Sequence, residues 1–320
     1  MPSMRPLIDM RLRPSFLHSF FGSSPGTADF ETVRWLNKRV GGTDVDHFTR
    51  SNDVPSLLKE MTNAGIGTGI MVGRSTPTVR ISNDALAKIA VRSGGRLVGV
   101  ASVDPIQLAA ADAVAEVHRS IKQLGLRGLN IDAGFYAKPL KANDGRLLPL
   151  YEACEKLGVP ACVMSGPTTP DLAYNDPSAV DDIARLFPKL SIICCHGFYP
   201  RVAEMITVAF RNENVFVSPD MYTWMPGGHL YLEAARGFMQ DQFLFGSSYP
   251  FRPMAQGVSD LLAVGFESDV LTKVGSGTAM RLFGLRSTSA SATAPRTKGR
   301  AKSIYGGPKS LKGTRTGEEL

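Results

Sequence analysis

The sequence is poor in cysteine and histidine and has no long apolar run. Its 320 residues include 4 cysteines and 5 histidines. No Cys-x-x-Cys pair occurs, so the common thiolate metal and redox motifs are excluded. No segment reaches the ~18 apolar residues that a membrane span needs, and residues 1–5 lack the apolar run of a secretory signal. We therefore predict a cytoplasmic protein with reduced cysteines and no membrane partner.

All four cysteines have apolar neighbours in the sequence, which is typical of buried thiols. They are Cys154, Cys162, Cys194 and Cys195. Cys194 also has a second interpretation, because it stands two residues before His196 on a predicted strand and would face the same side. A nucleophilic Cys194 is the alternative, and a core residue is the favoured interpretation.

Positive charge is concentrated at the C-terminus. The net charge is +7, but residues 286–320 hold eight basic residues against two acidic ones, so the rest is close to neutral. Few apolar and many small residues predict a disordered basic tail after a folded domain at 1–285. Such a tail can contact nucleic acid. Without interleaved aromatic residues, a solvated terminus is favoured over a nucleic-acid partner.

Eight short apolar runs alternate with segments of helical periodicity. The predicted strands lie at 7–13, 68–73, 97–104, 128–132, 161–165, 191–196, 215–219 and 243–247. The predicted helices lie at 54–64, 85–92, 109–124, 147–157, 180–187, 200–211, 230–239, 257–264 and 277–282. Eight strand–helix units in roughly 250–290 residues indicate an α/β fold, the (β/α)8 TIM barrel. A doubly wound open sheet is the alternative, although no Gly-x-Gly-x-x-Gly or P-loop motif follows any strand.

The connection after the first predicted strand is long. Residues 15–52 form a predicted irregular insertion that is rich in aromatic residues: Phe16, Phe20, Phe21, Phe30, Trp35 and Phe48. An aromatic insertion on the active face of a barrel is typical of a lid or of an oligomer contact. The sequence leaves both interpretations open.

Two arginines stand at the end of the first predicted strand. Arg11 and Arg13 are two residues apart, so both side chains leave the same face of the strand. Paired guanidinium groups bind carboxylates well and metal cations poorly. Because barrel active sites lie at the C-terminal strand ends, we predict that at least one of them contacts an anionic ligand. Ion pairing with Asp9, Asp104 or Asp132 is the structural alternative.

His196 is the only histidine at a predicted strand end, and imidazole exchanges a proton near neutral pH. Asp132 and Asp220 also stand at strand ends and could orient the imidazole or act as a base. We predict these three residues as catalytic. The side chains predicted to bind substrate at other strand ends, besides Arg11 and Arg13, are Arg74, Tyr136, Met164, Tyr222, Ser248 and Arg252.

Five landmarks, in this order, resemble the amidohydrolase 2 family of (β/α)8 barrels. They are Leu-Ile-Asp at 7–9, Ala-Ser-Val-Asp-Pro at 101–105, Leu-Pro-Leu-Tyr-Glu-Ala-Cys-Glu-Lys-Leu-Gly-Val-Pro at 148–160, Cys-His-Gly at 195–197 and Phe-Gly-Ser-Ser-Tyr-Pro-Phe at 245–251. The resemblance covers residues 6–285. The family includes metal-dependent decarboxylases of aromatic acids, hydratases and dicarboxylate lactonases, so the resemblance implies a barrel enzyme. Family members are commonly dimers or higher oligomers, so it also implies a homo-oligomer.

The chain departs from the metal ligands of the family it resembles. The His-x-His pair of the family's first strand is Arg11-Leu12-Arg13 here. The family's strand-five histidine falls on Met164, and its strand-eight aspartate falls on Ser248. Only the strand-six histidine is kept, as His196. A catalytic zinc or manganese ion needs about three protein ligands, so the resemblance predicts a member that holds no metal and no other cofactor.

The resemblance and the arginines together predict a metal-independent hydrolase, lactonase-like, that acts on a small carboxylate-bearing substrate of the aromatic-catabolism type. Some lactonases of the family are similar in working without a metal. His196 with Asp220 or Asp132 would activate water, and Arg11 and Arg13 would hold the oxyanion or a carboxylate. Non-oxidative decarboxylation of an aromatic acid is one alternative. A non-catalytic binding protein or inactive partner subunit on the same barrel is the other.

Overall fold

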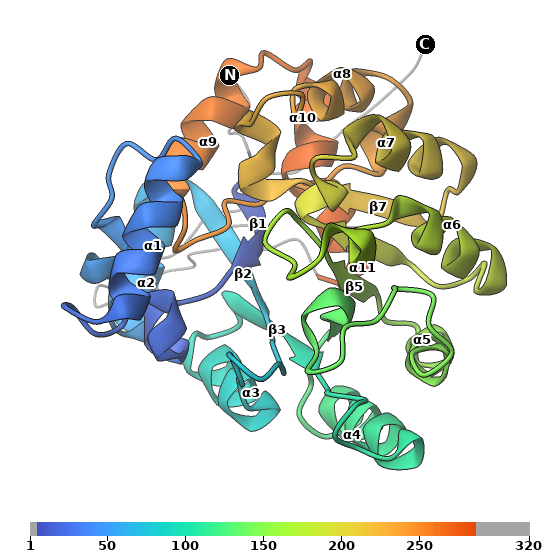
Figure 1. Ribbon diagram of the computed structural model, residues 1–320. Helices are drawn as coiled ribbons and strands as arrows, with labels where there is room; N and C mark the ends of the chain where they lie inside the picture. The colour runs from blue at the N-terminus through green and yellow to red at the C-terminus, as the bar shows by residue number, and fades with distance from the viewer. Residues whose placement is uncertain (1–4, 286–320) are drawn as a thin grey trace, which may run out of the picture. The chain divides into compact units, whose positions relative to one another are not determined.

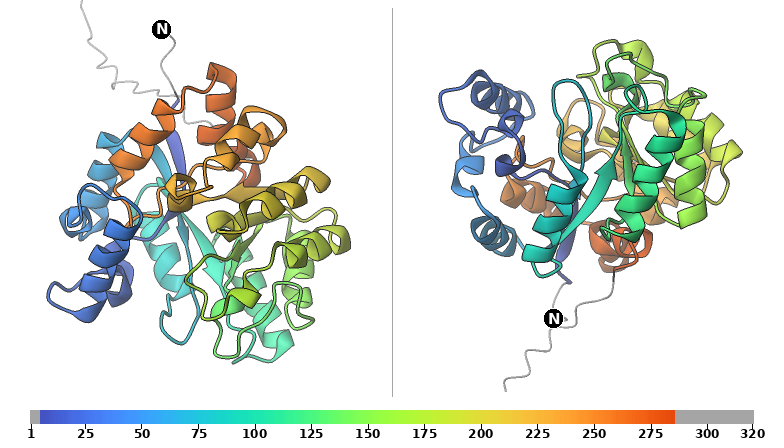
Figure 2. Two further views of the ribbon diagram at one scale, coloured as in Figure 1. Left: turned by 45° about the horizontal axis from the view of Figure 1, so that its top comes forward. Right: turned by 90° about the horizontal axis from the view of Figure 1, so that it is seen from below.

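Seven parallel strands form the centre of the molecule and helices cover them (Figures 1 and 2). The computed structural model describes residues 5–285. Each strand pairs in parallel with the next one along the chain, from the first to the seventh. The strands are β1 Leu7–Leu12, β2 Ile66–Val72, β3 Leu97–Ser102, β4 Leu129–Ile131, β5 Ala161–Met164, β6 Ile192–Cys195 and β7 Val215–Ser218. This is the predicted TIM barrel.

The helices alternate with the strands along the chain. They are α1 Ala28–Arg39, α2 Val54–Asn63, α3 Asn83–Arg92, α4 Ala110–Lys122, α5 Leu148–Leu157, α6 Pro177–Leu186, α7 Val202–Arg211, α8 Leu230–Arg236, α9 Met254–Ala263, α10 Ser268–Thr272 and α11 Thr278–Leu282. A π-helical turn, Lys273–Gly277, joins the last two. Helix α2 contacts α9, so the region after β1 meets the helices near the end of the barrel.

Local sequence signals set the ends of several helices. At the start of α2 the Asp53 carboxylate accepts a hydrogen bond from the Ser56 amide, and the Ser56 hydroxyl accepts one from the Asp53 amide. The apolar residues Val54, Leu57 and Met61 then face the core at helical spacing. Helix α5 ends at Gly158, which adopts the left-handed conformation of a C-terminal cap.

The core has two layers because strand residues alternate between the two faces of the sheet. Side chains such as Met10, Ile70 and Val100 fill the inside of the barrel. Their strand neighbours, including Met71 and Ala101, pack outward against the helices. Filling of the barrel interior leaves the strand ends as the place where polar side chains can gather.

The eighth predicted strand, residues 243–247, is not formed as a regular strand. Leu244 N donates to Val217 O at 3.0 Å, and Met10 N donates to Phe245 O at 2.9 Å, so the segment still lies between β7 and β1. The Phe245 amide donates to Val274 O at 3.1 Å instead of to a strand. The ladder is therefore interrupted, and the barrel is closed by isolated bridges.

The predicted irregular insertion contains a regular helix, α1, which the sequence analysis missed. Most of its residues are polar, and only Phe30, Val33 and Asn37 are buried, so its apolar periodicity is weak. Thr27 caps its first turn. Phe21 and Phe48 are fully buried, whereas Trp35 is 55% exposed. Phe21, Phe30 and Phe48 thus pack into the core, whereas much of the insertion is exposed, and its role as a lid or an oligomer contact stays a prediction.

Three further expectations concern the rest of the chain. The predicted tail, 286–320, lies outside the described residues. Among residues 5–285, no helix combines the length and the apolar character needed to cross a bilayer. All four cysteines are buried and free. Cys194 packs in the outer core layer and burial raises the pKa of its thiol, so the nucleophile alternative loses its basis.

Candidate active site

The C-terminal strand ends carry unusual backbone conformations. Within the described part of the chain, four residues other than glycine have left-handed φ angles, and three of them are predicted site residues. They are His196 at 61°, Asp220 at 56° and Ser248 at 63°. Such conformations cost about 1–3 kcal/mol each and gather at functional sites. The turn at His196 also breaks the strand alternation, which explains why His196 does not share a face with Cys194.

His196 lies between a carboxylate and a guanidinium. Its Nδ1 is 3.0 Å from Asp220 Oδ2, and its Nε2 is 3.5 Å from Arg11 Nη2. The Nδ1 contact is close but poorly aligned as a hydrogen bond, so a small ring rotation is needed for full donation. An Nδ1–H that faces the carboxylate leaves the lone pair of Nε2 towards the arginine. The geometry thus favours a single tautomer.

Burial and charge keep this histidine neutral. The pKa of His196 is lowered to about 4, first by burial and second by the Arg11 cation, while Asp220 acts in the opposite direction. The imidazole is therefore unprotonated at neutral pH, and its Nε2 is a base rather than a proton donor.

Arg11 is the central cation of the site. It is 2% exposed, and its Nη2 donates to Met164 Sδ at 2.8 Å, while its Nε lies 3.9 Å from Asp220 Oδ2. Its Nη1 has no protein acceptor. A buried charged donor without a partner is costly, so this N–H is ready to bind an anionic ligand oxygen.

Two more guanidinium groups lie close to Arg11. Arg13 Nε donates a hydrogen bond to Val72 O at 2.9 Å, and its guanidinium lies over the ring of Phe21. Arg74 lies over the ring of Phe135, with its carbon 4.4 Å from the centroid. Burial, followed by repulsion from Arg11 and Arg74, lowers the pKa of Arg13 well below its usual value. The three cations repel one another, and an anion between them would relieve that repulsion.

Asp132 belongs to the Arg74 side of the site. Its Oδ1 is 3.7 Å from Arg74 Nε, which is longer than a direct hydrogen bond, and its Oδ2 accepts from Asn130 Nδ2 at 2.9 Å. No contact joins Asp132 to His196. Asp220 rather than Asp132 is therefore the carboxylate that orients the histidine.

The remaining predicted residues are placed differently. Tyr222 packs edge-on against the His196 ring at 5.2 Å, and Met164 contacts Arg11. The Ser248 hydroxyl accepts from the Met221 amide at 3.4 Å.

Two predicted residues are engaged elsewhere. Tyr136 is buried, and its hydroxyl donates a hydrogen bond to Val103 O at 3.2 Å, so this hydroxyl is used by the fold. Arg252 pairs with Asp260 on α9 beside the ring of Trp224, with no contact to His196 or Arg11.

Two residues that hold the site together were not among the predicted site residues. Asp9, considered only as an ion-pair partner, accepts hydrogen bonds from the amides of Arg11 at 3.0 Å and Ser247 at 2.9 Å, and from the Ser247 hydroxyl. Gly246 lies against Asp220 and Arg11. Both lie within the landmark segments at 7–9 and 245–251, but only the three-dimensional contacts reveal their roles.

The family of the chain can be decided by comparison with known proteins. The sequence model of the amidohydrolase family matches residues 46–285. The chain belongs to the amidohydrolase family. A curated relative, 2-amino-3-carboxymuconate-6-semialdehyde decarboxylase from Dictyostelium discoideum, is 36% identical over 76 residues, which is 24% of this chain. That match spans only 20% of the relative's length.

Solved structures show the same fold. An uncharacterized TIM-barrel protein from Bordetella bronchiseptica is 30% identical, covering 87% of this chain and 98% of that one, with a TM-score of 0.78. A 5-carboxyvanillate decarboxylase from Sphingomonas paucimobilis is 20% identical over 89% and 100% of the two chains, with a TM-score of 0.62. A dihydroxybenzoic acid decarboxylase from a Polaromonas species is 18% identical over 88% and 98%, with a TM-score of 0.64.

The residues of this site do not fit a divalent cation. The Polaromonas enzyme is described with bound manganese. In this chain no three His, Cys, Asp or Glu side chains within residues 5–285 are grouped to hold a metal ion. The Nε2 of His196 instead faces the guanidinium of Arg11. A cation beside that guanidinium would meet one imidazole and strong repulsion rather than the roughly three ligands it needs.

The site is closed in this conformation. His196, Arg11 and Asp220 are each 5% exposed or less. Two surface cavities, of about 290 and about 510 Å³, are lined by other residues, and none of these three is among them. We take the strand-end cluster as the chemical site because its residues converge, whereas the cavities hold no comparable base.

Replacing Gly246 by alanine is expected to lower activity about 100-fold, the loss that a 1 Å misplacement of a reacting group can cause. A Cβ at this position would lie 2.3 Å from Asp220 Oδ1 and 3.0 Å from Arg11 Cβ, so both side chains must move. Steady-state kinetics and the acidic limb of the pH profile measure the effect. The matched control is Gly145→Ala, where a Cβ meets nothing within 4 Å. Equal activity of the two variants would contradict this role of Gly246.

Replacing Asp9 by asparagine is expected to change how stability depends on pH. Burial raises the pKa of Asp9 to about 6 from an ordinary value of 3.8. The folded state therefore holds this proton more tightly, and ionisation of Asp9 costs roughly 3 kcal/mol of stability as pH rises from 4 to 6. Denaturant unfolding across that range should show that Asp9→Asn becomes more stable relative to the wild type as the pH rises, because the variant has no carboxyl group to ionise. A pH-independent difference would contradict the prediction.

Proposed function

We propose that the chain is a metal-independent hydrolase that opens a lactone or related acyl bond in a small carboxylate-bearing molecule. The observation that carries the proposal is the position of His196, with its Nδ1 at Asp220 and its Nε2 at Arg11. This arrangement supplies a neutral base and a fixed cation at one point, which is what water attack on an acyl carbon requires.

The proposed steps follow from the protonation states. His196 Nε2 takes a proton from water as the water oxygen attacks the carbonyl carbon, and Asp220 stabilises the imidazolium. Arg11, through its unpartnered Nη1, holds the developing oxyanion. The imidazolium then gives its proton to the leaving alkoxide as the carbon–oxygen bond breaks. Arg13 and Arg74 hold a carboxylate of the substrate by charge.

Decarboxylation of an aromatic acid is the second candidate. It is supported by the names of the comparison proteins, two of which are decarboxylases of carboxyvanillate and dihydroxybenzoic acid. The three guanidinium groups would bind the carboxylate of such a substrate equally well. Protonation of a ring carbon, however, needs an acid near neutral pH, and the lowered pKa of His196 makes it a poor one.

A substrate panel with product analysis separates the two reactions. The full chain is incubated with carboxylate-bearing lactones and with hydroxybenzoic acids, in excess chelator, and products are identified by mass spectrometry. Gain of one water supports hydrolysis, and loss of carbon dioxide supports decarboxylation. Turnover that stops with chelator and returns with added manganese would overturn the metal-independent proposal.

Binding without turnover would favour a third outcome, the non-catalytic barrel. Saturable binding of an aromatic dicarboxylate that is lost in Arg11→Met, with no product formed under any condition, would assign the site to recognition alone.

A further inference from the structure

The turn that carries His196 is left-handed over three consecutive residues. His196, Gly197 and Phe198 have φ angles of 61°, 59° and 54°. Glycine adopts this conformation freely, whereas a histidine and a phenylalanine do so only at a cost. The turn directly follows β6, whose last residue is Cys195. Contacts with other parts of the chain must therefore hold these residues in a conformation that they would not keep alone.

This conformation decides where the imidazole lies. Cys194 packs in the outer core layer and Cys195 inside the barrel, so the next residue of a regular strand would face outward again. The left-handed turn instead places His196 Nδ1 3.0 Å from Asp220 Oδ2 and His196 Nε2 3.5 Å from Arg11 Nη2. A turn that relaxed to extended backbone would lose both contacts.

The connection between β5 and α6 holds this turn through two side chains. The first is Ser165, which directly follows β5 and is 1% exposed. Its hydroxyl donates a hydrogen bond to Cys195 O at 2.6 Å and accepts one from the Phe198 amide at 2.9 Å. A hydroxyl can do both because it is a donor and an acceptor at once. One side chain thus joins the residue before the left-handed turn to the last residue of the turn.

The second side chain is that of Asn175, which lies two residues before α6 and is 1% exposed. Its Nδ2 donates to Phe198 O at 3.2 Å and to Tyr199 O at 2.8 Å. Its Oδ1 accepts from the Gly166 amide at 3.0 Å. Gly166 itself lies against the histidine, because a Cβ built on this glycine would be 3.5 Å from His196 Cβ. The amide of Asn175 is therefore spent on main-chain groups on both sides of the histidine.

Two groups from other elements also bond the turn. The Tyr231 hydroxyl on α8 donates to Gly197 O, and the His196 amide donates to Asp220 Oδ2 at 3.3 Å. The turn keeps these partners when one side chain of the β5–α6 connection is removed. Such variants are therefore expected to fold, with the turn loosened.

We propose that Ser165 and Asn175 are positioning residues of the proposed reaction, which act through His196 by holding its left-handed turn. Their hydrogen bonds go to the main chain, so neither side chain touches the reacting atoms. The kinetic part of this inference rests on the proposed function. The geometric part, that these two residues keep the imidazole at Asp220 and Arg11, is tested without a substrate.

Nitrogen-15 NMR of the imidazole rings tests the geometry on the full chain. In the wild type, Nδ1 of His196 faces Asp220, so one neutral tautomer with an unprotonated Nε2 is expected at neutral pH. In Ser165→Ala and in Asn175→Ala the ring is released from the carboxylate that selects this tautomer, and we expect a mixture of the two tautomers. The spectrum of His196→Gln identifies the His196 signals among those of the five histidines.

Steady-state kinetics with the substrate that the panel identifies give the functional readout. Each of the two variants should lower kcat at least about tenfold, because a misplaced reacting group can cost about 100-fold. The KM should change much less, since Arg13 and Arg74 hold the substrate carboxylate and are not bonded to either residue.

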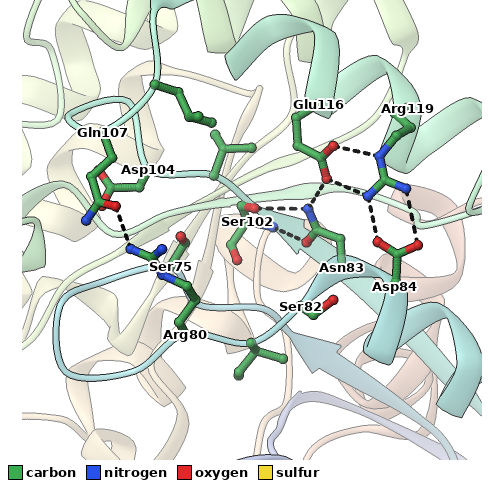
Figure 3. A pocket seen from close by; sticks show the side chains of 13 residues that line it. Ser75, Arg80, Ser82, Asn83, Asp84, Ser102, Asp104, Gln107, Glu116 and Arg119 are labelled. Carbon is green, nitrogen blue, oxygen red and sulfur yellow. Dashed lines mark hydrogen bonds and ion pairs between the residues drawn. The ribbon is translucent and has the colours of Figure 1, made fainter. Parts of the chain in front are cut away.

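The matched control is Asn83→Ala. Asn83 is likewise a buried asparagine that bonds the main chain at a strand end: its Nδ2 donates to Ser102 O at 3.1 Å, and its Oδ1 accepts from the Ser102 amide at 3.0 Å (Figure 3). Both residues line a cavity of about 290 Å³ to which none of the residues of the proposed reaction contributes. The control should lose stability as Asn175→Ala does, and keep a single His196 tautomer and the wild-type kcat.

A tautomer mixture and a lowered kcat that are confined to Ser165→Ala and Asn175→Ala support the proposal. A single tautomer in both variants, each verified as folded by its unfolding curve, would overturn it, as would a changed tautomer with wild-type kcat or equal effects in Asn83→Ala. If no form of the protein turns over any substrate of the panel, the proposed reaction fails, and the NMR result alone decides whether the two residues hold the histidine.

Discussion

Replacing His196 by glutamine is expected to lower kcat by about 10²–10⁴, the usual contribution of a positioned acid–base group. Glutamine keeps a polar side chain of similar length but cannot accept a proton from water. The neighbours Asp220 and Arg11 stay in place, so KM should change much less than kcat. Steady-state kinetics with the substrate that the panel identifies give both constants.

The control for this experiment is His118→Gln. His118 is exposed on α4, outside the candidate site, so its replacement should leave both constants unchanged. If His196→Gln keeps wild-type kcat, His196 is not the base, and the reaction must be assigned to another group of the cluster.

Replacing Arg11 by methionine is the second change with a large expected effect, a loss of about 10²–10³ in kcat/KM. Methionine keeps the apolar part of the side chain and removes the charge that holds the oxyanion. The loss should appear in kcat and in kcat/KM, since the cation acts on charge that develops in the transition state. Arg146→Met, an exposed arginine that pairs only with Asp144, is the matched control.

The same variant has a consequence for pH dependence. The base must be neutral, so activity falls as pH drops through the pKa of His196, which is about 4. Burial is the largest cause of that low value and Arg11 the second. Without the cation the pKa rises, and the acidic limb of the profile moves to higher pH. Because burial remains, the pKa of His196 should stay below its ordinary value of 6.5. A limb that does not move, or moves to lower pH, contradicts the assigned neighbourhood of His196.

Most of the fold could be predicted from periodicity. Seven strands and the helices between them follow apolar patterns that repeat at the spacing of strands and helices. The eighth segment was predicted as a strand because residues 243–247 are mostly apolar, but the Phe245 amide donates to Val274 O, far along the chain. Helix α1 was missed because its buried residues are few, and a cap such as Thr27 is a weak signal alone.

The site was predictable where it depended on topology. Strand ends converge in a barrel, so Arg11, His196 and Asp220 could be brought together before their distances were known. The pairing of His196 with Asp220 rather than Asp132 could not be chosen, since both carboxylates stand at strand ends. Asp9 and Gly246 stand in landmark segments, but their roles depend on contacts with distant parts of the chain, Asp9 with Ser247 and Gly246 with Asp220 and Arg11, which the segments alone do not reveal.

The most direct test of the central claim, that this site works with arginine charge and without a metal ion, is the metal content of active, full-length protein purified without chelator. Elemental mass spectrometry should find less than about a tenth of an equivalent of manganese, zinc or iron, because a catalytic ion must occupy its site to act. Near one equivalent of any of these metals, retained through gel filtration and lost in His196→Gln, would contradict the account.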